Sequence, residues 1–149
     1  MENLNSENLN HIIKNRDSRK TLVCVTNQFE CERIIKSGRI ISDLTHTDLE
    51  TISVVSSAYP NNPEALEYLY KITKEYKGIM YVEYSDTPLK TISKYIKQNK
   101  VSNVLTGVPT SPDSIIFKLR NKFTDINFFT VESDGEIKEA TDTCLSENI

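Results

Sequence analysis

Five short, continuously apolar runs alternate along the chain with stretches in which apolar residues recur at helical spacing. Each run is too short for a helix and is rich in residues that favour strands. The five predicted strands cover residues 22–26, 51–59, 79–84, 101–108 and 126–131. Strands that are apolar on both sides pack between two helical layers, so the sequence predicts an α/β fold with a parallel sheet covered on both faces.

Three of the predicted helices begin with the same pair of signals, a capping residue followed by proline. These pairs are Asn62–Pro63, Thr87–Pro88 and Ser111–Pro112. The cap accepts a hydrogen bond from the first turn, and proline fits the next position because its nitrogen needs no partner there. A further helix follows the first strand, where Ile34, Ile35 and Ile41 belong to one apolar stripe.

The expected ligand site follows from this topology. Parallel strands are joined by right-handed crossovers, so helices reach both faces only if the winding direction reverses once. The reversal opens a crevice at the carboxyl ends of the strands, where ligands of such folds bind. The loops expected to form its rim are residues 26–29, 59–62, 85–87 and 107–113.

Charge and composition exclude several classes of function. The net charge is −3, with 18 basic and 21 acidic residues mixed along the chain, so we expect no nucleic-acid surface. No apolar run approaches the roughly 18–20 residues of a membrane helix. The N-terminus lacks a secretory pattern, and three cysteines in no pairing pattern fit a reducing compartment. We therefore expect a cytoplasmic protein that does not associate with membranes.

The two ends of the chain are more polar than its centre. Residues 1–19 are predicted to form a polar tail or a short helix, and residues 134–149 a polar, flexible tail. The predicted α/β domain therefore covers residues 20–133.

Known catalytic patterns do not fit the expected crevice. A response-regulator receiver needs an acid pair after the first strand and a lysine after the fifth, and only Asp86 matches one of its positions. The dinucleotide pattern G-x-G-x-x-G is missing after the first strand. Both histidines, His11 and His46, fall outside the crevice, which argues against a histidine-dependent catalytic or metal site. We expect neither enzyme activity nor a metal.

Several segments resemble the universal stress protein family, and they are most similar to its diverged branch that forms a domain inside bacterial Kdp-type potassium-sensor histidine kinases. The segments are VCVT with CERIIKSG, EALEYLYKITKEY, YSDTPLKTISKYIKQNKVSNVLTG and SPDSIIFKLRNKF, within residues 21–131. The resemblance implies a Rossmann-like fold with a five-stranded parallel sheet in the order 3-2-1-4-5, assembled as a homodimer.

The resemblance also implies a nucleotide site. Many family members bind ATP, with an acid at the end of the first strand and a loop of pattern G-x2-G-x9-G-[ST] after the fourth. Here Thr26 or Asn27 stands at the acid position. Gly107 matches the first glycine of the loop, but Thr110 stands at the second, and no Gly-[ST] pair follows. Two prolines in the loop also remove backbone donors, so ordinary ATP binding is not expected.

The residues left in the crevice are polar and uncharged. The predicted nucleotide-binding residues are Thr26, Asn27, Gln28, Thr106, Gly107, Thr110, Ser111 and Ser114. The amides of Asn27 and Gln28 suit a base edge, whereas hydroxyl groups at the start of the last helix suit a phosphate. Ser111 has a simpler interpretation as the cap of that helix.

Two functions remain open at this point. The first is a regulatory module without catalysis that senses an adenine nucleotide, cyclic di-AMP or ATP/AMP, and acts on a signalling partner in a stress response. The second is a dimeric interaction module that binds no nucleotide. Phe128, Phe129 and Val131 lie on the last predicted strand, a sheet edge through which family members pair, so we expect the homodimer to form there.

Overall fold

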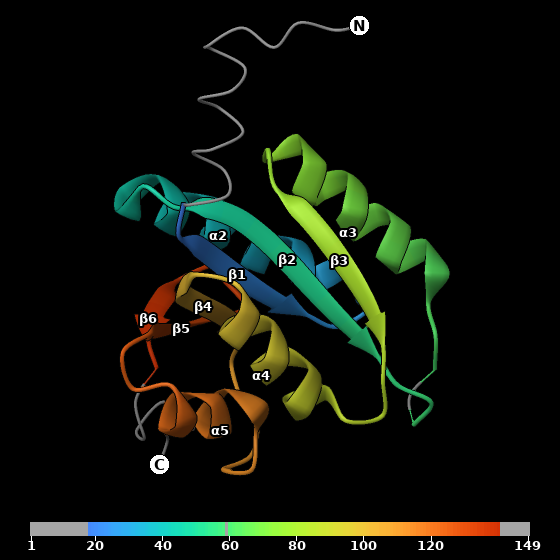
Figure 1. The fold of residues 1–149 in the computed structure, drawn as a ribbon. Helices are drawn as coiled ribbons and strands as arrows, with labels where there is room; N and C mark the ends of the chain where they lie inside the picture. The colour runs from blue at the N-terminus through green and yellow to red at the C-terminus, as the bar shows by residue number, and fades with distance from the viewer. Residues whose placement is uncertain (1–17, 59, 141–149) are drawn as a thin grey trace, which may run out of the picture.

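The computed structural model describes residues 18–58 and 60–140, and it contains one mixed sheet with helices on both faces (Figure 1). The strands are β1 (Lys20–Val25), β2 (Asp48–Val55), β3 (Ile79–Tyr84), β4 (Val101–Gly107), β5 (Asn127–Val131) and β6 (Ile137–Glu139). The helices are the 3₁₀ turn η1 (Phe29–Cys31) and the α-helices α2 (Glu32–Thr45), α3 (Pro63–Glu75), α4 (Pro88–Gln98) and α5 (Ile115–Lys122). The predicted α/β class is confirmed.

The sheet has six strands in the order β3-β2-β1-β4-β5-β6, so the predicted five-stranded sheet is wrong in strand count. Strands β1 to β5 are parallel, and β6 adds an antiparallel strand beside β5. From β1 the chain winds outward to β2 and β3, then returns to β4 on the other side. This reversal puts the carboxyl ends of β1 and β4 at the switch point, where a crevice is expected.

Strand β6 corrects two further predictions. It pairs Ile137 with Val131 and Glu139 with Phe129, so β5 is not the edge strand. A turn at Gly135, whose φ is 92°, reverses the chain between the two strands. Residues 137–139 are therefore part of the sheet and not of a flexible tail. Residues 1–17 of the predicted tail 1–19, with His11, and residues 141–149 of the predicted tail 134–149, with Cys144, lie outside the described residues.

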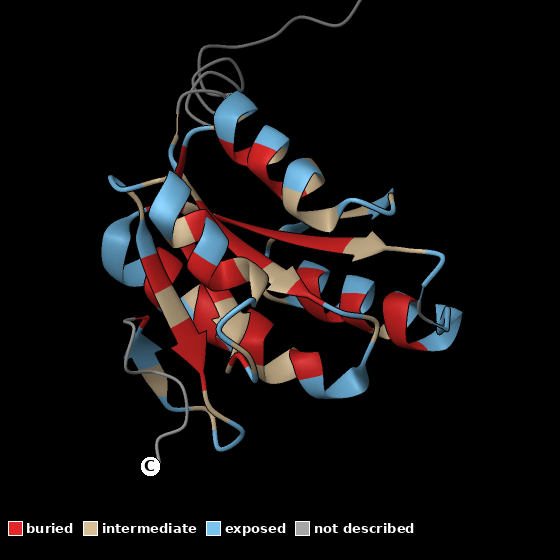
Figure 2. Cartoon of the chain, turned by 90° about the horizontal axis from the view of Figure 1, so that it is seen from below, coloured by how far each residue is buried: buried red, intermediate tan, exposed pale blue. Residues whose placement is uncertain are grey.

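Each face of the sheet has its own apolar core. On the face covered by α2 and α3, Val23, Ile35 and Leu69 are fully buried. On the face covered by α4 and α5, Leu22 and Leu119 are fully buried. Neighbouring residues of β1 thus enter different cores, as expected for a strand buried on both sides. Figure 2 shows the central strands largely buried, whereas the helices alternate between buried and exposed residues.

Gly38 allows α2 to lie unusually close to the sheet. A Cβ atom at this position would lie only 2.4 Å from Val23 Cγ2 and 2.9 Å from Leu49 Cδ1. Real Cβ atoms do not approach other atoms this closely, so the backbone of α2 packs directly on β1 and β2. The first helix of the domain is thereby held against the strand that ends at the crevice.

Two of the predicted helix starts are confirmed and one is wrong. Helix α3 begins at Pro63, and Asn62 Oδ1 accepts a hydrogen bond from Ala65 N at 3.2 Å. Helix α4 begins at Pro88, directly after Thr87. Helix α5 begins at Ile115 and not after Ser111, because residues 111–114 form a separate turn.

A polar network centred on the buried Asn103 joins the amino ends of three strands, at the opposite end of the sheet from the crevice. Asn103 on β4 donates from Nδ2 to Thr21 Oγ1 and to Thr45 Oγ1, both at 3.0 Å. Asn103 Oδ1 accepts a hydrogen bond from Asn127 Nδ2 at 3.1 Å. Thr21 and Thr47 extend the network with a contact of 2.6 Å between their hydroxyl oxygens.

Within the described ranges, none of the helices combines the length and the apolar character needed to cross a membrane.

Candidate functional site

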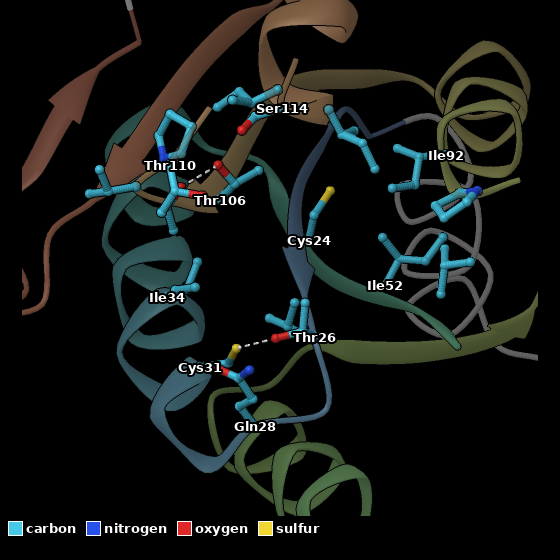
Figure 3. A pocket seen from close by; sticks show the side chains of 18 of the residues that line it. Cys24, Thr26, Gln28, Cys31, Ile34, Ile52, Ile92, Thr106, Thr110 and Ser114 are labelled. Carbon is cyan, nitrogen blue, oxygen red and sulfur yellow. Dashed lines mark hydrogen bonds between the residues drawn. The ribbon is translucent and has the colours of Figure 1, made fainter. Parts of the chain in front are cut away.

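A cavity of about 610 Å³ lies at the carboxyl ends of β1 and β4, where the winding reverses (Figure 3). Its lining comes from the end of β1, the start of α2, the ends of β2 and β4, the loop before α5, and the first turns of α4 and α5. The lining residues are Cys24, Val25, Thr26, Gln28, Cys31, Arg33, Ile34, Ile52, Val54, Ser56, Pro88, Ile92, Thr106, Gly107, Val108, Pro109, Thr110, Ser114, Ile115 and Ile116.

Six of the eight residues predicted to bind a nucleotide line this cavity. They are Thr26, Gln28, Thr106, Gly107, Thr110 and Ser114. The sheet brings the β1 end and the β4 loop together although about 80 residues separate them in the chain. Figure 3 shows Thr110, Thr106 and Ser114 on one side of the cavity, with Thr26 and Gln28 below them.

Two of the hydroxyl groups already have partners within the protein. Thr106 Oγ1 donates to the carbonyl oxygen of Gly107 at 2.8 Å. Thr26 Oγ1 lies 3.5 Å from Cys31 Sγ. These contacts fix the direction of both side chains, and each hydroxyl oxygen retains a lone pair for a ligand donor.

Asn27 lies in a second, smaller cavity of about 390 Å³ at the ends of β1 and β2. Its Nδ2 donates to the carbonyl oxygen of Pro60 at 2.9 Å, which ties the first loop to the loop after β2. The two cavities share the residues Thr26, Gln28, Val54 and Ser56. The predicted pair Asn27–Gln28 is therefore divided, because only Gln28 reaches the larger cavity.

Ser111 does not line either cavity. Its Oγ accepts a hydrogen bond from Asp113 N at 3.1 Å, and its carbonyl oxygen accepts one from Ser114 N at 3.1 Å. The prediction that Ser111 caps α5 is wrong, since Ser114 occupies the position before the helix. Ser111 shapes the loop and leaves Ser114 at the cavity.

Arg33 is the one charged residue among the described lining residues, and the sequence analysis did not identify it. Its Nε donates to the carbonyl oxygen of Glu132 at 2.9 Å, and its Nη1 donates to that of Glu30 at 2.9 Å. A Cβ atom on Gly107 would lie 3.4 Å from Arg33 Nη2. The guanidinium group therefore lies directly beside Gly107, at a distance that would be an ordinary van der Waals contact for a larger side chain.

The other missed residues form an apolar lobe of the same cavity. Ile52, Val54, Ile92, Ile115 and Ile116 come from β2, α4 and α5. Figure 3 shows Ile52 and Ile92 across the cavity from Ile34, with β1 between them. Their sequence pattern is that of ordinary core residues, so nothing in the sequence distinguishes them as cavity residues.

The lining contains few ionisable side chains. Among the described lining residues there is no carboxylate and no histidine. Burial raises the pKa of the Cys24 thiol to about 12, so this thiol is protonated and a poor nucleophile at neutral pH. His46 ends α2 in a left-handed conformation, with a φ of 56°. A search for metal-binding clusters of histidine, cysteine and acidic residues finds none in residues 18–58 and 60–140.

Asp86 has a structural contact beside the cavity. Its Oδ1 accepts hydrogen bonds from Ser57 N at 2.7 Å and from Ser57 Oγ at 2.8 Å. These two bonds lower the pKa of Asp86, because they stabilise its charged form. The acid that matches one receiver position therefore ties the loop after β2 to the loop after β3.

Comparison with known proteins identifies no family. No family model matches the chain, and no curated protein matches it significantly. The universal stress protein resemblance therefore rests on short sequence segments within residues 21–131.

Proposed function

We propose that this protein is a non-catalytic regulatory module of the universal stress protein type that binds an adenine nucleotide in the larger cavity. The observation that carries the proposal is the convergence of Thr26, Gln28, Thr106 and Thr110 on one cavity at the switch point of the sheet. The order of β1 to β5 agrees with the order that the resemblance implies. We further propose that the bound ligand changes how the module engages a signalling partner.

The size and lining of the cavity support a nucleoside ligand. A volume of about 610 Å³ lies within the usual range for small-molecule sites. In the apolar lobe, the half-buried Val54 and Ile115 offer a surface for a planar base. Gln28 carries both a donor and an acceptor for the base edge, and Thr110 and Ser114 offer hydroxyl groups to a ribose or phosphate.

The charge of the cavity favours a ligand with few phosphate charges. Arg33 is the single cation among the described lining residues, and it already donates to carbonyl groups. The loop after β4 contains Pro109 and Pro112, which have no N–H groups to offer to phosphate oxygens. AMP or cyclic di-AMP therefore fits this site better than ATP does.

The lack of a general base or a reactive nucleophile among the described lining residues supports a binding role over catalysis. A protonated Cys24 cannot act as a nucleophile at neutral pH. We therefore propose that the nucleotide is released unchanged.

Two serines near the start of α5 provide a matched test of the cavity. Ser114→Tyr places a ring in the cavity, whereas Ser111→Tyr adds the same ring to the same loop but outside the cavity. We expect isothermal titration calorimetry with AMP and cyclic di-AMP to show binding to the wild type. Ser114→Tyr should weaken binding more than about tenfold, which is ~1.4 kcal/mol, and Ser111→Tyr should leave it nearly unchanged.

Two results would contradict the proposal. One is the lack of binding of any adenine nucleotide to wild-type protein that melts cooperatively. The other is equal weakening by the two tyrosine variants, which would place the nucleotide outside this cavity. Guanine nucleotides serve as the specificity control, and conversion of ATP, followed by chromatography, tests the non-catalytic part of the proposal.

A further inference from the structure

Strand β3 is an open edge of the sheet. Its only strand partner among the described residues is β2, and Figure 1 shows it as the outermost strand on its side. Ser85 N donates to the carbonyl oxygen of Val55, so odd-numbered residues of β3 face β2. Because backbone groups alternate along a strand, the N–H and C=O groups of Met80, Val82 and Tyr84 point outward.

The side chains of β3 do not protect this edge. Natural edge strands are often blocked by lysine, by proline or by their short length. The sequence IMYVEY contains neither residue type, and the strand has six residues. Ile79 is 56% exposed and Tyr84 is 74% exposed. At the opposite edge, β6 has only three residues, two of which are the charged Lys138 and Glu139.

We propose that a second copy of this chain pairs with β3 through its own β3, antiparallel and about a twofold axis at Val82. In this register Val82 lies opposite Val82 of the other copy, and Met80 lies opposite Tyr84. All outward backbone groups of the strand then find partners of the matching type. The exposed ring of Tyr84 covers Met80 across the junction, so the same surface is used by both copies.

The charges at the two ends of β3 favour the antiparallel arrangement. Lys77 precedes the strand, whereas Glu83 and Asp86 lie at its carboxyl end. Antiparallel pairing brings the basic end of each strand next to the acidic end of the other, twice in one dimer. A parallel arrangement would place like charges together, which is unfavourable.

This inference differs from the pairing through Phe128, Phe129 and Val131 that the sequence resemblance implies. The edge of β5 is occupied by β6, and Ala140 N donates to the carbonyl oxygen of Phe128 at 2.7 Å. No strand among the described residues occupies the outer edge of β3. Dimerisation through β3 also does not depend on the proposed nucleotide, so it can be tested independently of ligand binding.

The first test measures the dimer by light scattering after size-exclusion chromatography over a range of concentrations. We expect a dimer of the wild type at micromolar concentrations. Tyr84→Lys should weaken it more than about tenfold, because it removes the covering ring and adds an edge-blocking charge. The matched control is Leu44→Lys, since Leu44 on α2 is 72% exposed and lies away from β3. It should leave the dimer unchanged.

The second test fixes the register by cross-linking in a Cys144→Ser background. Opposed residues of a hydrogen-bonded antiparallel pair have Cα atoms about 5.5 Å apart, which suits a disulfide. We expect Val82→Cys to form a disulfide-linked dimer under mild oxidation, whereas Ile79→Cys should not, although Ile79 is more exposed than Val82. Monomeric wild type at about 500 µM, equal effects of the two lysine variants, or equal cross-linking of the two cysteine variants would each overturn the proposal.

Discussion

Replacing Glu50 by glutamine should stabilise the protein at pH 8 by roughly 1–2 kcal/mol and have little effect at pH 4.5. Glu50 lies on β2, is 5% exposed, and its Oε1 has no hydrogen-bond partner among the described residues. Burial raises the pKa of Glu50 from an ordinary 4.5 to about 7. The positive charge of Lys20 opposes this rise, and the negative charge of Asp48 adds to it.

The sign of this effect follows from proton binding. Between pH 4.5 and about 7 the folded protein keeps the Glu50 proton that the unfolded chain has lost. The contribution of the Glu50 carboxyl group to the free energy of unfolding is therefore greatest below pH 4.5. This contribution falls as the pH rises and is lost above the folded pKa of about 7. Glutamine has nearly the same shape but carries no charge, so the Glu50→Gln variant avoids the loss.

Urea unfolding followed by circular dichroism at pH 4.5, 6 and 8 would check this prediction. Glu67→Gln on the exposed side of α3 is the control for the loss of one negative charge. If both variants showed the same pH dependence as the wild type, the carboxyl group of Glu50 would be ionised in the folded protein at ordinary pH.

Replacing Gly38 by alanine should destabilise the protein by about 2 kcal/mol, although alanine is the better helix former by about 1 kcal/mol. The added Cβ would lie 2.4 Å from Val23 Cγ2 and 2.9 Å from Leu49 Cδ1. Val23 is fully buried and Leu49 is 2% exposed, so neither side chain can move into solvent. Helix α2 must then move away from the sheet, which loosens the packing around both contacts.

A double variant separates this steric effect from other causes. Val23→Ala removes the Cγ2 atom that the new methyl group would meet. Val23→Ala is itself destabilising, because it leaves a smaller side chain in the core. The double variant should lose less free energy of unfolding than the sum of the losses in the two single variants. Strict additivity in urea unfolding would show that the cost of Gly38→Ala does not come from contact with Val23.

The alternation of strands and helices could be predicted because each element carries a strong local signal. The continuous apolarity of β1 and β4 predicted burial on both faces, and Pro63 and Pro88 marked the starts of α3 and α4. Strand β6 was missed because Ile137–Glu139 is short and largely charged. Its neighbouring Asp134–Gly135 pair is a recognised hairpin signal, which the apolar pattern did not take into account.

The candidate site was predictable where it depends on topology and less so where it depends on side-chain packing. The carboxyl ends of β1 and β4 meet in any sheet with this winding, so Thr26 and Thr106 could be placed together. Arg33 reaches the cavity because it bridges to the carbonyl group of Glu132, 99 residues away in the chain. Contacts between residues so far apart in the chain depend on the folded geometry, and no local sequence pattern predicts them.

The hydrogen-bond network around Asn103 implies an uneven distribution of motion along the sheet. It links the amino ends of β1, β4 and β5 to the carboxyl end of α2, and Thr21, Thr47 and Asn103 are its buried members. Opening that end requires several buried polar groups to separate at once, so its backbone amides should exchange with solvent slowly. At the opposite end, where the cavity lies, the cross-links come from Asn27, Arg33 and Asp86, and they join loops and chain ends through backbone groups and the exposed Ser57. We therefore expect slower amide exchange at the amino ends of β1, β4 and β5 than in the loops around the cavity.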